Sequence, residues 1–124
     1  PVPIGSKVSA FKQRDLSDYS TYEEAYHQLI MDLVDLQLIS TKLVIKGSDV
    51  KRIFVDGGFS KNTIFMNLLA NVFPEMEVFA ASMAQATAVG AALAIHAAWN
   101  KHPLPNDLIA LRFYAHSHEK NNQQ

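Results

Sequence analysis

The sequence predicts an α/β domain in which one long helix precedes a parallel βαβα unit. Apolar residues recur at spacings of three and four over residues 22–36, which is typical of a helix with one buried face. Two short β-rich runs follow, at residues 52–55 and 77–80, with a segment of helical periodicity between them. A third helical segment covers residues 82–100. Because strand, helix and strand are joined by short loops, we expect the two strands to be parallel neighbours.

The composition is that of a folded domain. Of the 124 residues, 48% are hydrophobic and 19% are charged, so the chain can bury a core. The net charge of −1 gives no electrostatic reason to expect nucleic acid or a membrane surface as a partner. The absence of cysteine excludes disulfides and thiolate metal sites and suits a cytoplasmic protein. The longest near-apolar stretch, residues 84–99, is shorter than the roughly 20 residues that cross a bilayer, so we expect a buried helix there.

The first part of the chain is predicted to be an irregular lead-in followed by the long helix. Residues 1–18 mix proline, serine and charged residues without a period. The chain begins with Pro1 and has no signal-peptide pattern, so we expect it to start inside a longer protein. A capping box, with Ser20 as N-cap and Glu23 at N3, predicts the start of the helix, and Gly47 suits its C′ position. The predicted apolar face consists of Tyr22, Tyr26, Leu29, Leu33 and Leu36.

The next strand and helix are predicted from short local patterns. The run at residues 52–55 is short and β-rich, as expected for a strand buried on both faces. The following helix is expected to begin after Ser60 and to end at Phe73, because Pro74 cannot continue the hydrogen-bond ladder. Its predicted inward residues are Ile64, Phe65, Leu68, Leu69 and Val72.

The last helix carries a stripe of small residues. Ser82 and Gln85 form a second capping-box pattern that predicts its start. Gly90 would cost about 1 kcal/mol relative to Ala in an exposed helix, so we expect close packing against another backbone or a sheet. Residues 101–124 are predicted to form a C-terminal tail with frayed last residues. The stripe consists of Ala86, Gly90, Ala94 and Ala97 or Ala98.

The turn after the first strand is the most informative motif, and it reads Asp56-Gly57-Gly58-Phe59-Ser60-Lys61-Asn62. Two adjacent glycines remove both Cβ atoms from a sharp turn, so a ligand can lie directly against the backbone. The helix that follows offers N–H groups and a partial positive charge. Parallel strands end at the same edge of a sheet, where the ligands of open α/β sheets bind. The turn alone is equally well explained as a tight βα connection without a ligand.

A second motif follows, Gln85-Ala86-Thr87-Ala88-Val89-Gly90-Ala91-Ala92. Together the two motifs resemble the C-terminal ATP-binding region of the FGGY family of sugar kinases, over residues 51–94. That family phosphorylates glycerol, xylulose, ribulose and related polyols. The resemblance implies part of a ribonuclease-H-like lobe of the actin-like ATPase superfamily, with residues 19–100 as an incomplete nucleotide-binding domain. Gln85 departs from the acidic residue that is usual in the family, and Val89 departs from its Leu.

The resemblance also implies roles for four residues of the turn. Gly57 and Gly58 would form the wall against which the adenosine of ATP lies, and Phe59 would pack beside the base. Asn62 would reach the adenine edge, because its amide can both donate and accept hydrogen bonds. Each role has a structural alternative, which is a ligand-free turn for the glycines, an ordinary core or surface aromatic for Phe59 and helix-start hydrogen bonding for Asn62. Asp56 lies on the adenosine side by resemblance, so it is not assigned to catalysis.

The expected function is therefore part of an ATP-dependent sugar or polyol kinase that supplies the adenosine side of the cleft. The family's phosphate-binding hairpins and its catalytic Asp are not among these residues, and neither are the Mg²⁺ ligands. We expect this piece to be inactive without its partners, which are the N-terminal kinase lobe, the rest of the parent chain and the sugar or polyol substrate. A homo-oligomer could cover the exposed edge of the small sheet. The sequence predicts no metal site, since the pair His116 and His118 lacks a third ligand.

Two alternatives remain open at this point. The first is a non-catalytic α/β interaction module that keeps the turn but binds no nucleotide. The second is a Rossmann-type dinucleotide binder, which is disfavoured because the third glycine of its fingerprint is missing. An acidic residue at the end of the next strand is also missing, since residues 80–82 read Ala-Ala-Ser.

Overall fold

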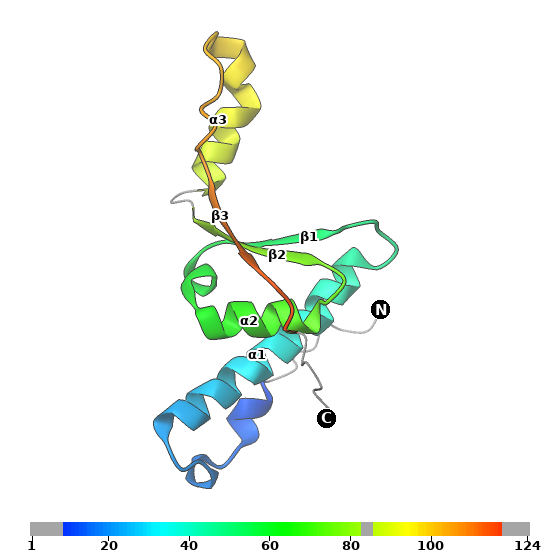
Figure 1. The fold of residues 1–124 in the computed structure, drawn as a ribbon, viewed down its shortest axis with the longest axis vertical. Helices are drawn as coiled ribbons and strands as arrows, with labels where there is room; N and C mark the ends of the chain where they lie inside the picture. Colours follow the sequence, from blue (N-terminus) through cyan, green and yellow to red (C-terminus); the bar gives the residue numbers. More distant parts are fainter. Residues whose placement is uncertain (1–8, 83–85, 118–124) are drawn as a thin grey trace, which may run out of the picture.

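The computed structural model describes residues 9–82 and 86–117, and it shows a mixed α/β domain (Figure 1). The element order agrees with the predicted long helix followed by a βαβα unit, and one further strand follows it. Three short 3-10 turns are η1 (Ala10–Gln13), η2 (Leu16–Asp18) and η3 (Gly58–Lys61). The helices are α1 (Tyr22–Ile45), α2 (Thr63–Val72) and α3 (Ala86–Trp99), and the strands are β1 (Arg52–Val55), β2 (Glu77–Ser82) and β3 (Ala110–Tyr114).

The three strands form one sheet in the order β1-β2-β3. β1 and β2 are parallel, as predicted, and Val55 pairs with Ala80, so both strands end at the same edge. β3 runs antiparallel to β2, with Tyr114 opposite Val78. This strand lies within the predicted C-terminal tail, so the prediction of two strands was wrong. A strand with one buried face is recognised by alternating buried and exposed residues. β3 lacks this alternation, because only Tyr114 is buried and its other four residues are exposed.

The helices α1 and α2 lie on one face of the sheet in two successive layers. Figure 1 shows α2 against the sheet and α1 beyond α2. Met66 of α2 and Val78 of β2 are completely buried where helix and sheet meet. The end of α2 at Val72, with Phe73 as C-cap, confirms the stop predicted from Pro74. The core consists of Ile30, Val34, Phe65, Met66, Leu69, Ala70, Phe73, Val78, Ala80 and Tyr114.

The opposite face of the sheet is exposed and aromatic. The prediction that β1 is buried on both faces was wrong, because β1 is an edge strand and Phe54 is 54% exposed. Phe54 stacks on Phe79 with ring centroids 5.3 Å apart, and Phe79 contacts Phe113 at 5.4 Å. Phe113 is 55% exposed. We call Phe54, Phe79 and Phe113 the aromatic face, and an exposed apolar patch of this kind is typical of an interaction surface.

Helix α1 begins one residue later than predicted. Thr21, rather than Ser20, is the N-cap, and its hydroxyl accepts a hydrogen bond from the backbone N–H of Glu24 at 3.1 Å. Glu24 in turn accepts one from the N–H of Ser20 at 2.9 Å. The shift has a simple cause, because two adjacent hydroxyl residues each precede a glutamate by three positions. The predicted C′ residue, Gly47, is confirmed by its φ of 77°.

The buried face of α1 also differs from the predicted one. Tyr22 is 79% exposed, whereas Ile30 and Val34 are buried in the core. Tyr26 and Leu33, which were predicted correctly, are half-buried and pack against that core. The buried face is therefore rotated about the helix axis relative to the predicted one. The sequence does not decide between them, because α1 has so many apolar residues that several of its faces show spacings of three and four.

The described part of the lead-in, residues 9–18, contains η1 and η2, and it is fastened to α1 by an ion pair whose carboxylate is buried. Asp32 is 4% exposed and receives hydrogen bonds from Arg14 Nε at 2.8 Å and Arg14 Nη2 at 2.9 Å. Gln28 Nε2 donates a third, at 2.9 Å. The hydrogen bonds from Arg14 lower the pKa of Asp32 in spite of the desolvation that raises it.

Helix α3 stands away from the sheet, and the chain returns along it to β3 (Figure 1). We call residues 86–109 the α3 arm. The prediction that this helix is buried was wrong, because Gly90 and Ala94 are exposed and a Cβ on Gly90 would meet no atom within 4 Å. A stripe of small residues permits another backbone to pack closely, but it does not ensure that the same chain supplies that backbone. Gln85 of the predicted capping box lies outside the described residues. In the part of the chain that is described, no helix is both long and apolar enough to cross a membrane.

Candidate functional site

The turn of residues 56–62, which we call the glycine turn, follows the end of β1 at the edge of the sheet where β2 also ends. Gly57 has φ 78° and ψ −156°, a conformation that residues with a side chain rarely adopt. Its carbonyl oxygen accepts hydrogen bonds from the backbone N–H of Ser60 at 3.2 Å and from the Ser60 hydroxyl at 2.7 Å. These bonds close the turn and lead the chain into η3 and then into α2. The turn is therefore a defined backbone corner.

The two glycines leave the corner bare. A Cβ atom added to Gly57 or Gly58 would meet nothing within 4 Å, and both residues are exposed. Only Gly57 requires glycine for its backbone conformation, since Gly58 has no positive φ. We call the exposed backbone of Gly57 and Gly58 the glycine corner. A flat ring could lie against it without meeting a side chain from either residue.

Phe59 lies next to the glycine corner and is anchored on one side. Its ring packs against the ring of Phe65 in α2, with centroids 4.6 Å apart. Phe65 belongs to the core, whereas Phe59 remains 47% exposed. Phe59 therefore packs as an ordinary aromatic on one side and keeps an exposed surface on the other.

Asn62 is the N-cap of α2, and both ends of its side-chain amide are engaged. The oxygen Oδ1 accepts a hydrogen bond from the backbone N–H of Phe65 at 3.0 Å. The nitrogen Nδ2 donates one to the hydroxyl oxygen of Tyr26 at 2.8 Å. An asparagine amide has two donor hydrogens and two acceptor lone pairs, so one of each remains for a ligand. The structural alternative for Asn62 is thus observed, and it is compatible with a contact to adenine.

The other polar residues of the turn are Asp56, Ser60 and Lys61. Asp56 and Lys61 are exposed, and Ser60 is buried with its hydroxyl on the carbonyl of Gly57. Among the described residues no group of three or more His, Asp or Glu could hold a metal ion.

After β3, the backbone N–H of Ser117 donates to Asn71 Oδ1 at 2.9 Å, so this segment is joined to α2. His118 lies outside the described residues.

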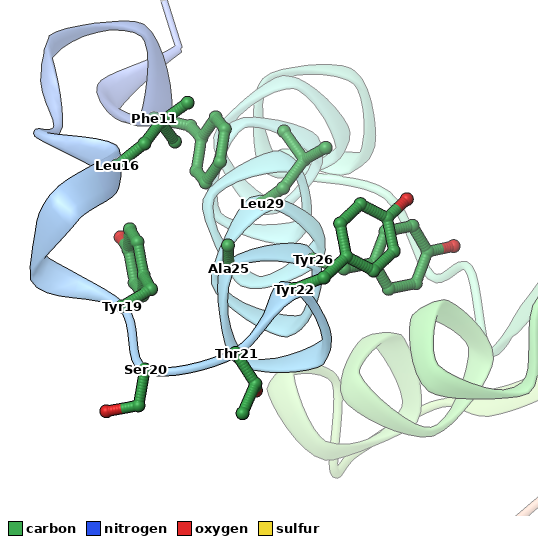
Figure 2. Close-up of a pocket in the computed structure, with 9 residues that line it drawn as sticks. All are labelled: Phe11, Leu16, Tyr19, Ser20, Thr21, Tyr22, Ala25, Tyr26 and Leu29. Carbon is green, nitrogen blue, oxygen red and sulfur yellow. The ribbon is translucent and has the colours of Figure 1, made fainter.

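A cavity of about 470 Å³ lies at the start of α1 (Figure 2). In Figure 2, Phe11 and Leu16 of the lead-in and Tyr19 just after it form one wall, across from Ala25 and Leu29 of α1. Tyr22 and Tyr26, also labelled there, line the cavity as well. Local sequence patterns do not predict this cavity, because residues of the lead-in and of α1 meet only in the folded chain. Its lining consists of Phe11, Leu16, Tyr19, Ser20, Thr21, Tyr22, Ala25, Tyr26 and Leu29.

Tyr26 connects this cavity to the glycine turn, since it lines the cavity and its hydroxyl holds Asn62. Sequence reasoning placed Tyr26 on the apolar face of the long helix and did not identify its polar partner. A tyrosine at an otherwise apolar position, whose hydroxyl needs a partner when it is half-buried, was the available signal.

Comparison with known proteins identifies the family of the chain. The family model described as the FGGY family of carbohydrate kinases, C-terminal domain, matches residues 19–99. The matched region runs from just before α1 to the end of α3 and contains the whole glycine turn. No curated protein and no solved structure matches the chain. Since the family model covers well over half of its residues, the chain belongs to the FGGY family of carbohydrate kinases, through the C-terminal domain of that family.

Proposed function

We propose that this chain supplies the adenosine-binding side of the cleft in an ATP-dependent sugar or polyol kinase. The single observation that carries the proposal is the glycine corner, which is open and is followed, after η3, by Asn62 at the start of α2. Membership in a carbohydrate kinase family makes ATP the expected nucleotide. A bare backbone suits the flat face of an adenine ring, and an amide with a spare donor and a spare acceptor on the same turn suits its polar edge.

The proposed contacts divide among the four residues of the turn. The adenosine lies against the backbone of Gly57 and Gly58, where a side chain would hold it away. The exposed side of Phe59 packs beside the base. The remaining N–H and lone pair of Asn62 serve the ring nitrogen and the exocyclic amine of adenine. None of these contacts displaces a hydrogen bond that the turn already makes.

The proposal does not extend to phosphoryl transfer by this chain alone. Transfer requires Mg²⁺, in-line positioning and a base for the substrate hydroxyl. The described residues offer no cluster of carboxylates for Mg²⁺, so we derive no step that involves the metal. We infer that the N-terminal kinase lobe and the rest of the parent protein hold the phosphates, Mg²⁺ and the sugar. The proposal also includes a ribonuclease-H-like arrangement and a cytoplasmic enzyme, and this division of ligands predicts an isolated chain without activity.

Nucleotide titration tests the proposal directly. ATP and ADP are added to the ¹⁵N-labelled chain while its backbone amide signals are followed. We expect the signals of Gly57, Gly58 and Asn62 to move together, and that of Gly90 in the α3 arm to stay in place. Gly58→Ala should weaken binding, since it adds a methyl group to the glycine corner without straining the backbone, whereas Gly90→Ala should not. Unmoved signals at the corner, or equal binding by both variants, would exclude it as the adenosine site.

One observation favours a second candidate function, a non-catalytic interaction module. The aromatic face exposes Phe54 and Phe113 to an extent that is unusual for large aromatic side chains of a lone domain. In that case the glycine turn is only a tight connection, and Asn62 serves only α2. The titration separates the two candidates, because a module of this kind leaves the corner signals unchanged at every ATP concentration.

A further inference from the structure

The cavity at the start of α1 has the size and the lining of a small-molecule site (Figure 2). Its volume of about 470 Å³ lies within the range of roughly 300–1,000 Å³ that is typical of ligand pockets. Leu16 and Tyr22 are exposed, so the cavity is open to solvent, whereas Ala25 and Leu29 are half-buried. An apolar surface of this kind gains free energy when a ligand displaces water from it.

One wall of the cavity is aromatic. The rings of Phe11 and Tyr19 stack on each other, with centroids 6.3 Å apart and an angle of 26° between their planes. Ala25 and Leu29 lie across from this wall in Figure 2, and Ala25 has the smallest side chain of the lining. A short side chain opposite two stacked rings leaves room for a flat molecule, and a further ring gains energy there beyond the area that it buries.

The cavity offers no free charge to a ligand. Among the described residues that line it, none is Asp, Glu, Lys, Arg or His. Arg14, which lies between Phe11 and Leu16 in the sequence, directs its charge to Asp32 through two hydrogen bonds. The pKa of Arg14 is raised, chiefly by the hydrogen bonding to Asp32, and the side chain of Tyr19 adds to this. The charge of Arg14 is therefore already paired.

The start of α1 does not attract an anion either. Glu23 and Glu24 both stand in its first turn, where their negative charges offset the partial positive charge of the helix. The carboxylate of Glu24 accepts the N–H of Ser20 at 2.9 Å, and the hydroxyl of Thr21 accepts the N–H of Glu24 at 3.1 Å. These backbone donors are therefore satisfied within the chain.

Hydroxyl groups supply the polar part of the lining. The Thr21 oxygen accepts the N–H of Glu24, and the Tyr26 oxygen accepts a hydrogen bond from Asn62 Nδ2 at 2.8 Å. Each of these two hydroxyls still has its own hydrogen to donate. A neutral oxygen of a ligand, such as that of a hydroxyl or an amide group, is a suitable acceptor for it.

We propose that this cavity binds a small neutral aromatic molecule that carries a hydroxyl or an amide group. The aromatic wall and the space above Ala25 accommodate its ring, and the hydroxyls of the lining bind its polar group. The proposal goes beyond the proposed function and does not rest on it, because no residue of the glycine turn is among those that line the cavity.

Titration with 2-naphthol, which is flat and neutral and has one hydroxyl group, tests the proposal. The affinity is read from the backbone amide signal of Leu29 in the ¹⁵N-labelled chain, so that binding elsewhere is not counted. We expect naphthalene-2-sulfonate, which has the same rings and a negative charge, to bind at least about tenfold more weakly, because no cation of the lining pairs with it. Decahydro-2-naphthol, which is neutral but saturated, should also bind more weakly, since it is not flat.

Three variants examine the two walls. Ala25→Leu fills the space opposite the rings and should weaken 2-naphthol binding by about tenfold or more. Ala97→Leu makes the same substitution at an exposed position of α3 and should leave binding unchanged. Phe11→Leu removes one ring of the aromatic wall, so it should weaken 2-naphthol binding about three- to tenfold and leave decahydro-2-naphthol unaffected. Urea midpoints close to that of wild type would show that each variant keeps the fold.

Nuclear Overhauser effects locate the bound probe. We expect contacts from the naphthol ring protons to the methyl groups of Ala25 and Leu29. Contacts to Phe113 instead would place the probe on the aromatic face and overturn the proposal. It is also overturned if 2-naphthol does not move the Leu29 signal, if the sulfonate binds as well as the alcohol, or if Ala25→Leu and Phe11→Leu both bind like wild type. Because no nucleotide is present in these measurements, none of their outcomes bears on the glycine corner.

Discussion

Arg14 and Asp32 form a bidentate ion pair in which Nε and Nη2 lie 2.8 Å and 2.9 Å from the two carboxylate oxygens. Parallel hydrogen bonds of this type fix geometry as well as charge. The pair joins the lead-in to the middle of α1 and so helps to build the wall of the cavity that Tyr26 also lines. The cavity therefore depends on an electrostatic contact that can be titrated.

Acid should weaken this contact and with it the folded state. The folded pKa of Asp32 is lowered from its ordinary value of 3.8, chiefly by the hydrogen bonds from Arg14. Below 3.8 the unfolded chain therefore binds more protons than the folded chain, and the stabilisation is lost as the pH falls through the folded pKa. Urea unfolding at pH 7 and pH 3 should show a smaller pH effect in Asp32→Asn than in wild type. Asp35→Asn, at an exposed position of α1, is the control and should show the same loss of stability between pH 7 and pH 3 as wild type. Asp15, whose pKa is also lowered, is present in all three proteins and so adds the same pH effect to each.

The cap of α2 should be measurable as stability. Asn62→Ala removes the acceptor for the N–H of Phe65, so we expect the free energy of unfolding to fall by about 1 kcal/mol, as is typical for a lost N-cap. Asn62→Asp keeps a capping oxygen and should lose less. Urea denaturation of both variants gives the comparison. Equal losses would show that the cap contributes little at this position.

The two glycines of the corner should respond differently to alanine. Gly57 has a φ of 78°, so Gly57→Ala should destabilise the chain by roughly 1 kcal/mol or more through backbone strain. Gly58 has an ordinary φ and open space around it, so Gly58→Ala should leave stability nearly unchanged while it obstructs the corner. Urea midpoints of the two variants test this. A large loss in Gly58→Ala would mean that the corner is more tightly packed than the structure shows.

The aromatic face should be detectable with a hydrophobic dye. Phe113→Thr removes one exposed ring of the face, and threonine suits an edge strand, so we expect weaker fluorescence of a bound anilinonaphthalene dye and little change in stability. Leu43→Ser on α1, which is exposed but lies outside the aromatic face, is the matched control and should not alter dye binding. Sedimentation of the same proteins would show whether the face also mediates self-association.

Local patterns were read correctly from the sequence, and contacts between distant segments were not. Gly47 and Pro74 mark helix ends through their own backbone chemistry, so both ends were predicted. Ser20 and Thr21 each satisfy the same capping pattern, and only the folded chain distinguishes them. β3 depends on pairing with β2, which leaves no trace in the alternation of its own residues.

The same division applies to the candidate site. The bare backbone of Gly57 and Gly58 follows from their residue types alone, so the corner could be predicted. The partner of Asn62 could not, because the hydroxyl of Tyr26 reaches it only after α1 and α2 have packed. The exposure of the α3 arm could not be predicted either, since small residues such as Gly90 suit close packing whether or not a partner is present.

The ends of the α3 arm meet in the sheet, because the chain leaves β2 at Ser82 and enters β3 opposite it at Ala110. Antiparallel strand ends that face each other in this way are commonly linked by a two-residue turn such as Asn-Gly. A shortened protein in which such a hairpin replaces residues 83–109 would keep the strand register and the glycine turn, but it would lose the second of the two family motifs. The register of β2 and β3 is thus set by their own pairing, so we expect the sheet to tolerate a change in the segment that joins them.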